Sequence, residues 1–371
     1  MHPEITTVIP TYRRPRLLER AIRSVLGQTY SNFRVCVYDN ASDDDTAEVV
    51  ARIARSDSRV EYHRHLNNIG MMRNFAFGIA RVQTPYFNVL GDDDFLLPGF
   101  FETAIRMLSA DCVPGFFFGG LLFVDESGIV AAPVEGWNLE GSVQRSAIFR
   151  ALFPGSWITW TSSLFRTAVV AAAGGLKPEL GYGGDVELLL RLSVWSTAIV
   201  APQACAVMNL HHGSASAADG GEEYSADRSL AIFRSVEGAI AQARTEGAIS
   251  SDEAGAMQRI VRDGLNWRFL RHACVMLARG HQASAAATAN TLEVEWGRTD
   301  LVNIVRLAAG NSAASVLICA ALRSLWRVRG AIRRHSNRSH YNSYAAAVDD
   351  VLKRLECDDC GLVARYSKRA L

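Results

Sequence analysis

The sequence predicts an α/β fold over residues 1–225, followed by a mostly helical region over residues 226–371. Short β-branched or aromatic runs alternate with amphipathic segments in the first half, which is typical of βαβ units around parallel strands. From about residue 226 the pattern changes to long helical periodicity with few strand-like runs. Apolar residues make up 49% and charged residues 21% of the 371 residues, which suits a large buried core.

Four strands are predicted in the first 90 residues. They are residues 5–10 (ITTVIP), 33–39 (FRVCVYD), 60–65 (VEYHRH) and 86–90 (YFNVL). Later runs at residues 198–202 and 205–212 are also predicted as strands.

Helices are predicted between these strands. The first begins at Pro15, which suits the first turn of a helix. The second is expected to start with Ser42 as its N-cap and Asp43, Asp44 and Asp45 in its first turn, where the helix dipole favours them. A third covers about residues 71 to 82, and a fourth follows the turn GYGG at residues 181–184.

The loops after the first four strands are rich in polar residues. They read PTYRR, DNASDDD, LNNIG and GDDDF. Because the carboxyl ends of parallel strands meet at one edge of a sheet, and ligands bind beyond that edge, these loops are expected to form one site.

The sharpest feature is the segment VLGDDDFLLP, where Asp92, Asp93 and Asp94 follow a buried-looking strand. Adjacent carboxylates repel each other, so a basic side chain or a metal ion is expected beside them. Hard oxygen donors suit Mg²⁺ or Mn²⁺. The alternative is an ordinary Asp-rich turn ahead of a helix that begins near Leu96.

Each of four further residues has a functional interpretation and a purely structural one. Asp39 ends a strand, where it either accepts bonds from a ligand or caps a turn. Arg73 suits phosphate oxygens but is equally a solvated helix residue. Asp185 is placed for a general base or a helix N-cap, and His211 for a metal ligand or a surface histidine.

Other classes of protein are disfavoured. The net charge of +1 gives no field that favours nucleic acid. Seven dispersed cysteines predict reduced, mostly buried thiols, and no secretory leader or membrane span is visible, so a cytoplasmic protein is expected. Neither a G-x-G-x-x-G after the first strand nor a P-loop motif is present.

The order of these motifs resembles a known family. The matching stretches are VIPTYRRPRLLERAIRSVLGQTY, VYDNASDDDT, LNNIGMMRN, YFNVLGDDDFLLPG, SSLFR, GYGGDVELLLRL and HHGSAS, between Thr6 and about Ser216. They are similar to the inverting nucleotide-sugar glycosyltransferases of family 2, whose catalytic domain has the GT-A fold, a Rossmann-like mixed sheet. The resemblance covers somewhat more than half of the chain.

The resemblance implies a role for each candidate residue. Residues for the nucleotide are Pro10, Thr11, Tyr12, Asp39, Asn68, Arg73, Asp92 and Asp93, with Asp39 accepting from the base and Arg73 facing the diphosphate. Asp94 is the implied metal ligand, His211 sometimes completes the coordination, and Asp185 matches the catalytic base. Gly91 and Gly184 stand where the family often has Asp and Glu.

The function expected from this resemblance is transfer of a sugar from a UDP- or dTDP-sugar to a saccharide, lipid-linked or small-molecule acceptor, with Mg²⁺ or Mn²⁺ as cofactor. Bacterial cell-surface polysaccharide or glycoconjugate synthesis is the expected setting, with natural-product glycosylation as the alternative. A nucleotidyltransferase on a similar sheet and a non-catalytic sugar-nucleotide scaffold are the alternatives. The basic, apolar stretch at residues 301–338 suggests either a core helix that ends in solvated arginines or peripheral contact with the inner face of the membrane. The C-terminal helices are expected to pack on the catalytic domain, to shape the acceptor cleft or to form a homodimer.

Overall fold

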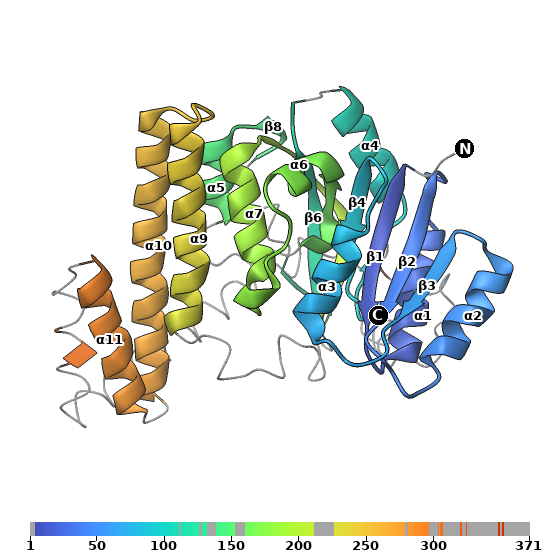
Figure 1. Ribbon diagram of the computed structural model, residues 1–371, viewed down its shortest axis with the longest axis horizontal. Coiled ribbons are helices and arrows are strands. Elements are labelled where there is room, and N and C mark those ends of the chain that lie inside the picture. The colour runs from blue at the N-terminus through green and yellow to red at the C-terminus, as the bar shows by residue number, and fades with distance from the viewer. Residues whose placement is uncertain are drawn as a thin grey trace. The chain divides into compact units, whose positions relative to one another are not determined.

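The computed structural model describes residues 4–110, 113–125, 128–131, 139–152, 160–210, 226–278 and 281–296, with isolated residues beyond 300. The chain divides into two compact units. The first comprises Met1–Gly220 with Tyr341–Leu371, and the second comprises Gly221–His340. Figure 1 shows the described elements of both units.

Ten strands of the described residues form one mixed sheet in the first unit, in the order β3-β2-β1-β4-β9-β6-β10-β5, with β7 beside β6 and β8 beside β10. Strands β1, β2, β3 and β4 run parallel, whereas β9 is antiparallel to β4 and β6. The bounds are β1 Ile5–Thr11, β2 Phe33–Asp39, β3 Val60–Arg64, β4 Tyr86–Val89, β5 Phe95–Leu96, β6 Phe116–Asp125, β7 Gly128–Ala131, β8 Gly141–Val143, β9 Ser163–Arg166 and β10 Ala198–Asn209.

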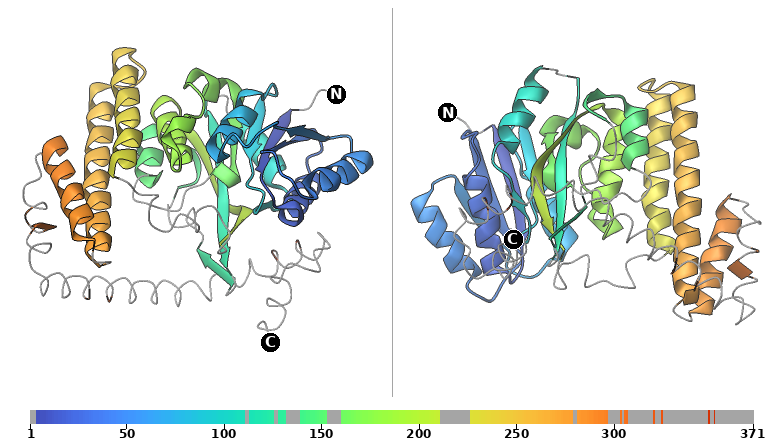
Figure 2. Two further views of the ribbon diagram at one scale, coloured as in Figure 1. Left: turned by 60° about the horizontal axis from the view of Figure 1, so that its bottom comes forward. Right: turned by 180° about the vertical axis from the view of Figure 1, so that it is seen from behind.

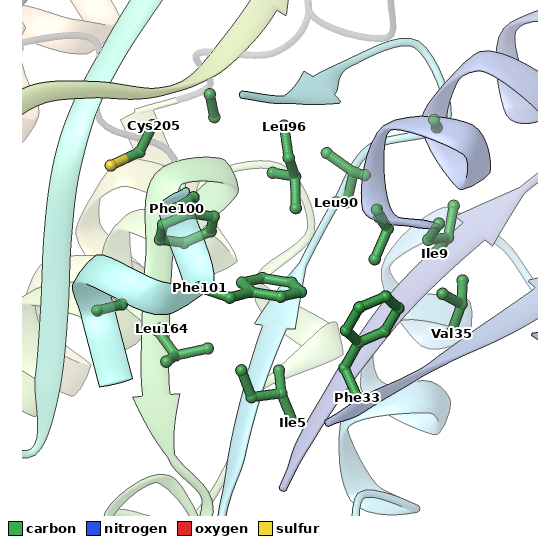
Figure 3. Packing of buried hydrophobic residues seen from close by; sticks show 14 of the residues in the cluster. Ile5, Ile9, Phe33, Val35, Leu90, Leu96, Phe100, Phe101, Leu164 and Cys205 are labelled. Carbon is green, nitrogen blue, oxygen red and sulfur yellow. The ribbon is translucent and has the colours of Figure 1, made fainter. Parts of the chain in front are cut away.

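Helices cover both faces of the sheet. On one face, α1 (Pro15–Leu26) and α4 (Phe100–Ala110) enclose a core that includes Ile5, Ile9 and Val35 (Figure 3). The alternate residues Val8 and Tyr38 point to the other face, where they pack with Phe77 of α3 (Met71–Ala80). Figure 2 shows this helix beside the strands. A Cβ atom on Gly78 of α3 would lie 2.6 Å from Cγ1 of Val8, so this helix sits close against the strands.

The remaining helices of the first unit connect the later strands. They are α2 (Thr46–Ser56), α5 (Arg145–Leu152), α6 (Thr167–Ala172) and α7 (Gly184–Trp195), with 3₁₀ turns at Trp160–Ser162 and Pro178–Leu180. Helix α7 packs against α5, and the 3₁₀ turn before α7 packs against α3. This last contact brings the α7 segment to the helix that follows β3.

The first four predicted strands and the predicted helices between them are confirmed, with three local corrections. Ser42 does not cap a helix, because α2 starts at Thr46 after Asp45, while Asp44 Oδ1 accepts from both the amide and the hydroxyl of Thr46. The two late strands predicted separately are one bulged strand, β10. A two-residue strand, β5, precedes α4, so no helix begins near Leu96.

The second unit contains three helices among its described residues, α9 (Ala226–Thr245), α10 (Ser251–Ala278) and α11 (Gln282–Trp296). Helix α10 packs against both of the others. Buried apolar residues recur every three or four positions on the packed faces, which is the spacing of a helix–helix seam. They are Leu230, Phe233, Val236 and Ile240 on α9, and Met257, Val261, Leu265 and Phe269 on α10.

Two sequence-based expectations about the whole chain are addressed by the described residues. None of their helices is both long enough and apolar enough to span a bilayer. Cys36 and Cys205 are buried free thiols, as predicted. The stretch at residues 301–338 lies almost entirely outside the described residues.

Candidate active site

The loops that follow β1, β2 and β4 meet at Thr11. Its backbone oxygen accepts a hydrogen bond of 2.9 Å from the amide of Asn40, the residue after Asp39. Its hydroxyl donates to Oδ2 of Asp92 at 2.8 Å. The parallel register pairs Thr11 with Asp39 directly. Thr11, at the end of β1, therefore links Asp39, the residue expected to bind the base, to the acidic segment Asp92–Asp94.

Asp39 is fully buried, and protein donors surround its carboxylate. Oδ1 accepts from the amide of Ser42 at 2.9 Å, and Oδ2 accepts from the Tyr62 hydroxyl at 2.6 Å. Nε of Arg64 lies 3.6 Å from Oδ2. Burial, together with the Asp39 carboxylate, raises the pKa of Tyr62. Asp39 thus caps the turn after β2, as the plainer reading anticipated, and also lies beside Thr11 at the sheet edge.

The loops after β1 and β2 are held in strained backbone. Arg13 and Ala41 have φ values of 55° and 64°, and among the described residues they alone combine a side chain with positive φ. This region of backbone space costs a non-glycine residue about 1–3 kcal/mol, and such strain clusters at functional sites. The Arg13 amide donates to the Ser42 hydroxyl at 2.8 Å, which joins the two strained loops.

Asn68 connects the loop after β3 to the loop after β2. Its Oδ1 accepts from Nδ2 of Asn40 and from the amide of Gly70, both at 2.9 Å. The Asn40 Oδ1 in turn accepts from the Ile69 amide at 2.8 Å. Gly70 has φ of 87°, a conformation that favours glycine, and α3 begins at the next residue. The described contacts of Asn68 therefore shape the loop.

Two of the three carboxylates of the acidic segment share one arginine. Nη1 of Arg14 lies 3.1 Å from Oδ1 of Asp92 and 2.7 Å from Oδ2 of Asp93. Burial and the neighbouring Asp93 charge raise the pKa of Asp92 to about 6, although Arg14 and the Thr11 hydroxyl oppose the shift. Arg14 is thus a basic side chain of the kind that the three adjacent carboxylates predict.

Asp94 has no ion-pair partner among the described residues. Oδ1 accepts from the amide of Asn209 at 3.1 Å, and Oδ2 accepts from the Thr161 hydroxyl at 3.2 Å. Burial and the charge of Asp93 raise the pKa of Asp94 well above its ordinary value. A buried carboxylate with only neutral donors favours either a proton or a cation.

A second arginine lies beneath the acidic segment. Arg20 on α1 is fully buried, donates from Nη2 to the backbone oxygen of Asp93 and lies over the ring of Phe95, with Cζ 5.2 Å from the ring centroid. The Asn209 Nδ2 donates to the same Asp93 oxygen. Arg20 and Asn209 therefore fix the backbone of the segment at Asp93.

The donor set fits a divalent cation. Three carboxylates lie in one short segment, and the guanidinium of Arg14 contacts two of them, Asp92 and Asp93. Oδ1 of Asn209 is buried and has no hydrogen-bond partner among the described residues, although the amide and Nδ2 of this residue both contact the segment. Mg²⁺ and Mn²⁺ favour such oxygen donors and usually take one or two protein carboxylates, with water and phosphate as other ligands. The described residues contain no group of three or more His, Cys, Asp or Glu side chains placed around one point, so a cation here would need water and phosphate as further ligands.

Contacts also connect the N-terminus of α7, which carries Asp185, to this region. Asp185 lies in the first turn of α7 and is half-buried, with Gly183 in the N-cap position, so Asp185 is not the N-cap. A Cβ atom on Gly184 would lie 3.0 Å from Cε of Met72, at the start of α3. One turn further along α3, Phe75 packs on Trp160 with ring centroids 5.0 Å apart, and Trp160 precedes Thr161, the partner of Asp94. A chain of contacts thus runs from Asp94 to the α7 N-terminus.

A buried ion pair anchors α7 at this position. Nε and Nη2 of Arg191 contact Oε1 and Oε2 of Glu187 at 2.7 and 2.8 Å. Arg191 also donates to the backbone oxygens of Ala173 and Gly175, in the loop that precedes the GYGG turn. Glu187 is fully buried, and Arg191 nearly so. Helix α7, which carries Asp185, is therefore tied to the loop that follows α6.

We expect Arg191→Met to lower the free energy of unfolding by about 3–5 kcal/mol, because it leaves the buried Glu187 carboxylate without its closest cation. The double variant Glu187→Leu/Arg191→Met removes both charges and is expected to recover most of this loss. Urea unfolding of the three proteins measures both effects. A double variant that is less stable than Arg191→Met would contradict this explanation.

The remaining candidate residues from the sequence are Pro10, Tyr12, Arg73 and His211. Pro10 is buried near the end of β1, and Tyr12, which follows the strand, is 37% exposed beside Arg13. Arg73 is exposed on the first turn of α3 and forms no hydrogen bond or ion pair with a described residue. His211 lies outside the described residues, two positions after Asn209.

The structure adds four residues to the sequence-based set, namely Arg14, Arg20, Thr161 and Asn209. Arg14 stands in the PTYRR loop, so a search for the counter-charge of the acidic segment could have found it. Arg20 looked like one more polar position on an amphipathic helix, and Asn209 like the end of a strand. Thr161 is joined to Asp94 across 67 positions of sequence, which only the fold reveals.

The family model described as Glycosyl transferase family 2 matches residues 6–121, which include β1 to β5 and the acidic segment. A glycosyltransferase from Campylobacter jejuni, GalNAc(5)-diNAcBac-PP-undecaprenol beta-1,3-glucosyltransferase, is 29% identical over 193 residues, or 51% of this chain and 60% of that protein. Glycosyltransferase GlyG from Streptococcus pneumoniae is 26% identical over 117 residues, or 31% of this chain and 39% of that protein.

A solved structure shares the fold over most of the chain. The crystal structure of S. aureus TarS 1-349 in complex with UDP-GlcNAc has a TM-score of 0.64 and 14% sequence identity, and the match covers 87% of this chain and 91% of that chain. The expected GT-A fold with a helical C-terminal portion is therefore confirmed.

Proposed function

We propose that this chain, which carries a glycosyl transferase family 2 domain, is an inverting, metal-dependent glycosyltransferase that moves a sugar from a nucleotide-diphosphate sugar to an acceptor hydroxyl. The observation that carries the proposal is the link through Thr11, which joins the buried Asp39 turn to Asp92 at one edge of the sheet. A base-binding carboxylate and an acidic segment at adjacent strand ends suit the two ends of a nucleoside diphosphate.

The nucleotide is assigned to the loops after β1, β2 and β3. Pro10, Thr11 and Tyr12 line the base, and Asp39 accepts from the base N–H. Asn68 supports this loop through Asn40, and the exposed Arg73 is a ligand for the diphosphate. The strain at Arg13 and Ala41 supports the same assignment, because it is concentrated in two of these loops.

Asp93, Asp94 and Asn209 are the described residues that would hold a divalent cation, with Asp92 kept in place by Thr11 and Arg14, and His211 a further candidate ligand. When bound, Mn²⁺ or Mg²⁺ supplies positive charge that stabilises the departing diphosphate. Arg20 and Asn209 hold the Asp93 backbone, so the carboxylates keep their positions as charge develops.

Asp185 is assigned as the general base that takes the proton from the acceptor hydroxyl as it attacks the anomeric carbon. Attack from the face opposite the leaving diphosphate inverts the configuration in one displacement. Helix α7 presents Asp185 in its first turn, and the Glu187–Arg191 pair holds that turn in place. Holding Asp185 in a fixed position lowers the activation barrier of transfer, because the base is already oriented toward the acceptor hydroxyl.

Binding of Mn²⁺ is expected to depend on pH. The pKa values of Asp92 and Asp94 are raised in the folded protein, so without metal the folded state binds more protons than the unfolded state. Stability in the absence of metal therefore falls as the pH rises above the ordinary carboxyl range to about 6. Because a cation needs ionised carboxylates, the rise in melting temperature given by Mn²⁺ should increase between pH 5 and pH 7. A rise that is the same at both pH values would contradict the assignment of these carboxylates.

The donor class is tested by thermal melting with UDP, dTDP, GDP and ADP, each with and without Mn²⁺. We expect UDP or dTDP with Mn²⁺ to raise the melting temperature most. No shift with any nucleoside diphosphate would overturn the proposed function. The Campylobacter relative is named for a polyprenyl-diphosphate acceptor, which supports a lipid-linked saccharide as the first acceptor class to assay and synthesis of cell-surface glycans as the setting.

A further inference from the structure

Arg14 occupies a place in the site that the assigned roles do not explain. One nitrogen of its guanidinium contacts both Asp92 and Asp93, at 3.1 and 2.7 Å. Burial lowers the pKa of Arg14, but the two carboxylates outweigh this effect and raise it overall, so the group stays charged. A permanent positive charge thus lies against the carboxylates that stand beside the cation ligand Asp94.

Arg14 differs from the second arginine of the segment in its exposure. Arg20 is fully buried and holds a backbone oxygen. Arg14 stands just before α1, and its side chain is 26% exposed, so part of the side chain already faces solvent. If it turns away, Asp92 keeps the hydrogen bond from the Thr11 hydroxyl.

We propose that Arg14 is an internal counter-cation, which holds Asp92 and Asp93 while the donor is absent and turns to the donor diphosphate when cation and donor bind together. The inference rests on the proposed function. Like charges repel, so Arg14 opposes a divalent cation at Asp93 and Asp94 until another anion can receive the guanidinium. A diphosphate is such an anion, since the planar guanidinium fork matches phosphate oxygens.

The consequence is a link between cation binding and donor binding. With Arg14 on the carboxylates, the donor-free enzyme has a low affinity for Mn²⁺. Once the diphosphate takes Arg14, the carboxylates are released and the affinity for Mn²⁺ rises. By linkage, Mn²⁺ raises the affinity for the diphosphate by the same factor. Arg14 would therefore weaken cation binding in the absence of donor.

Calorimetric titration of MnCl₂ into the full chain, with and without saturating UDP, tests the inference. Without UDP, we expect Arg14→Gln to bind Mn²⁺ about fivefold more tightly than the wild type, or more, because a repelling charge is lost. The factor by which UDP tightens Mn²⁺ binding should be smaller in this variant than in the wild type. Arg52→Gln is the matched control, because Arg52 is exposed and pairs with Glu19 on the outer side of α1.

An Arg14→Gln protein that binds Mn²⁺ no more tightly than the wild type would overturn the inference. If that variant does not fold, Arg14→Met decides, since methionine also removes the repelling charge. Tighter Mn²⁺ binding by Arg14→Met supports the inference, and equal or weaker binding overturns it. The proposed function is judged separately by the wild type alone, in which UDP and Mn²⁺ are expected to strengthen each other's binding.

Discussion

Asp94→Asn is expected to lower kcat for sugar transfer by about 10³-fold while leaving the fold at least as stable as the wild type. Both oxygens of Asp94 accept from neutral donors, and burial raises its pKa, so ionised Asp94 is unfavourable when no cation is present. Asparagine keeps much the same shape without the charge, so the cost of the buried carboxylate disappears together with the cation site.

Rates of nucleotide release and melting temperatures without metal check the two halves of this prediction. Asp43→Asn is a suitable control, because Asp43 is exposed on the neighbouring loop and pairs with Arg13. If Asp94→Asn had the kcat of the wild type, Asp94 would not be a ligand of a cation that transfer needs. A fall in melting temperature comparable to that of a core variant would instead indicate a structural role for Asp94.

Asp185→Asn is expected to lower kcat by about 10²- to 10⁴-fold, with little change in the affinity for UDP in the presence of Mn²⁺. Asp185 lies on α7, whereas the assigned nucleotide loops follow β1, β2 and β3, so the substitution leaves those loops intact. Asparagine cannot accept the proton of the acceptor hydroxyl, which removes the proposed general base.

Steady-state kinetics and calorimetry with UDP separate these two effects. Glu179→Gln provides the control, since Glu179 is an exposed carboxylate in the 3₁₀ turn just before α7. If Asp185→Asn retained kcat within tenfold of the wild type, another group would have to act as base. If it weakened UDP binding as much as it lowered kcat, Asp185 would belong to the donor site.

The sheet and its order of polar loops could be predicted from the sequence because they depend on local patterns. ITTVIP, FRVCVYD and YFNVL each carry the strand signal themselves, and Pro15 marks the first helix. The N-terminus of α2 was misplaced because Ser42, Asp44 and Asp45 all have side chains suited to a cap, and only the tertiary fold assigns Ser42 to Arg13 and Asp39.

The candidate site could be predicted only in part, because its partners are distant in sequence. The acidic segment predicted a nearby positive charge, but Arg14 is 78 and 79 positions away from the carboxylates it contacts. Asn209 lies 115 positions from Asp94, and nothing in CAVMNL indicates that its amide oxygen is buried without a partner. Such contacts follow from the way the strands are ordered in the sheet, which local propensity does not encode.

The most direct test of the account is the affinity for UDP, measured by calorimetry with and without Mn²⁺, in the wild type, Asp94→Asn and Asp185→Asn. If cation and diphosphate share the acidic segment, Mn²⁺ should tighten UDP binding in the wild type and in Asp185→Asn, but not in Asp94→Asn. If Mn²⁺ changed UDP binding equally in all three proteins, or in none of them, the proposed arrangement of the site would be wrong.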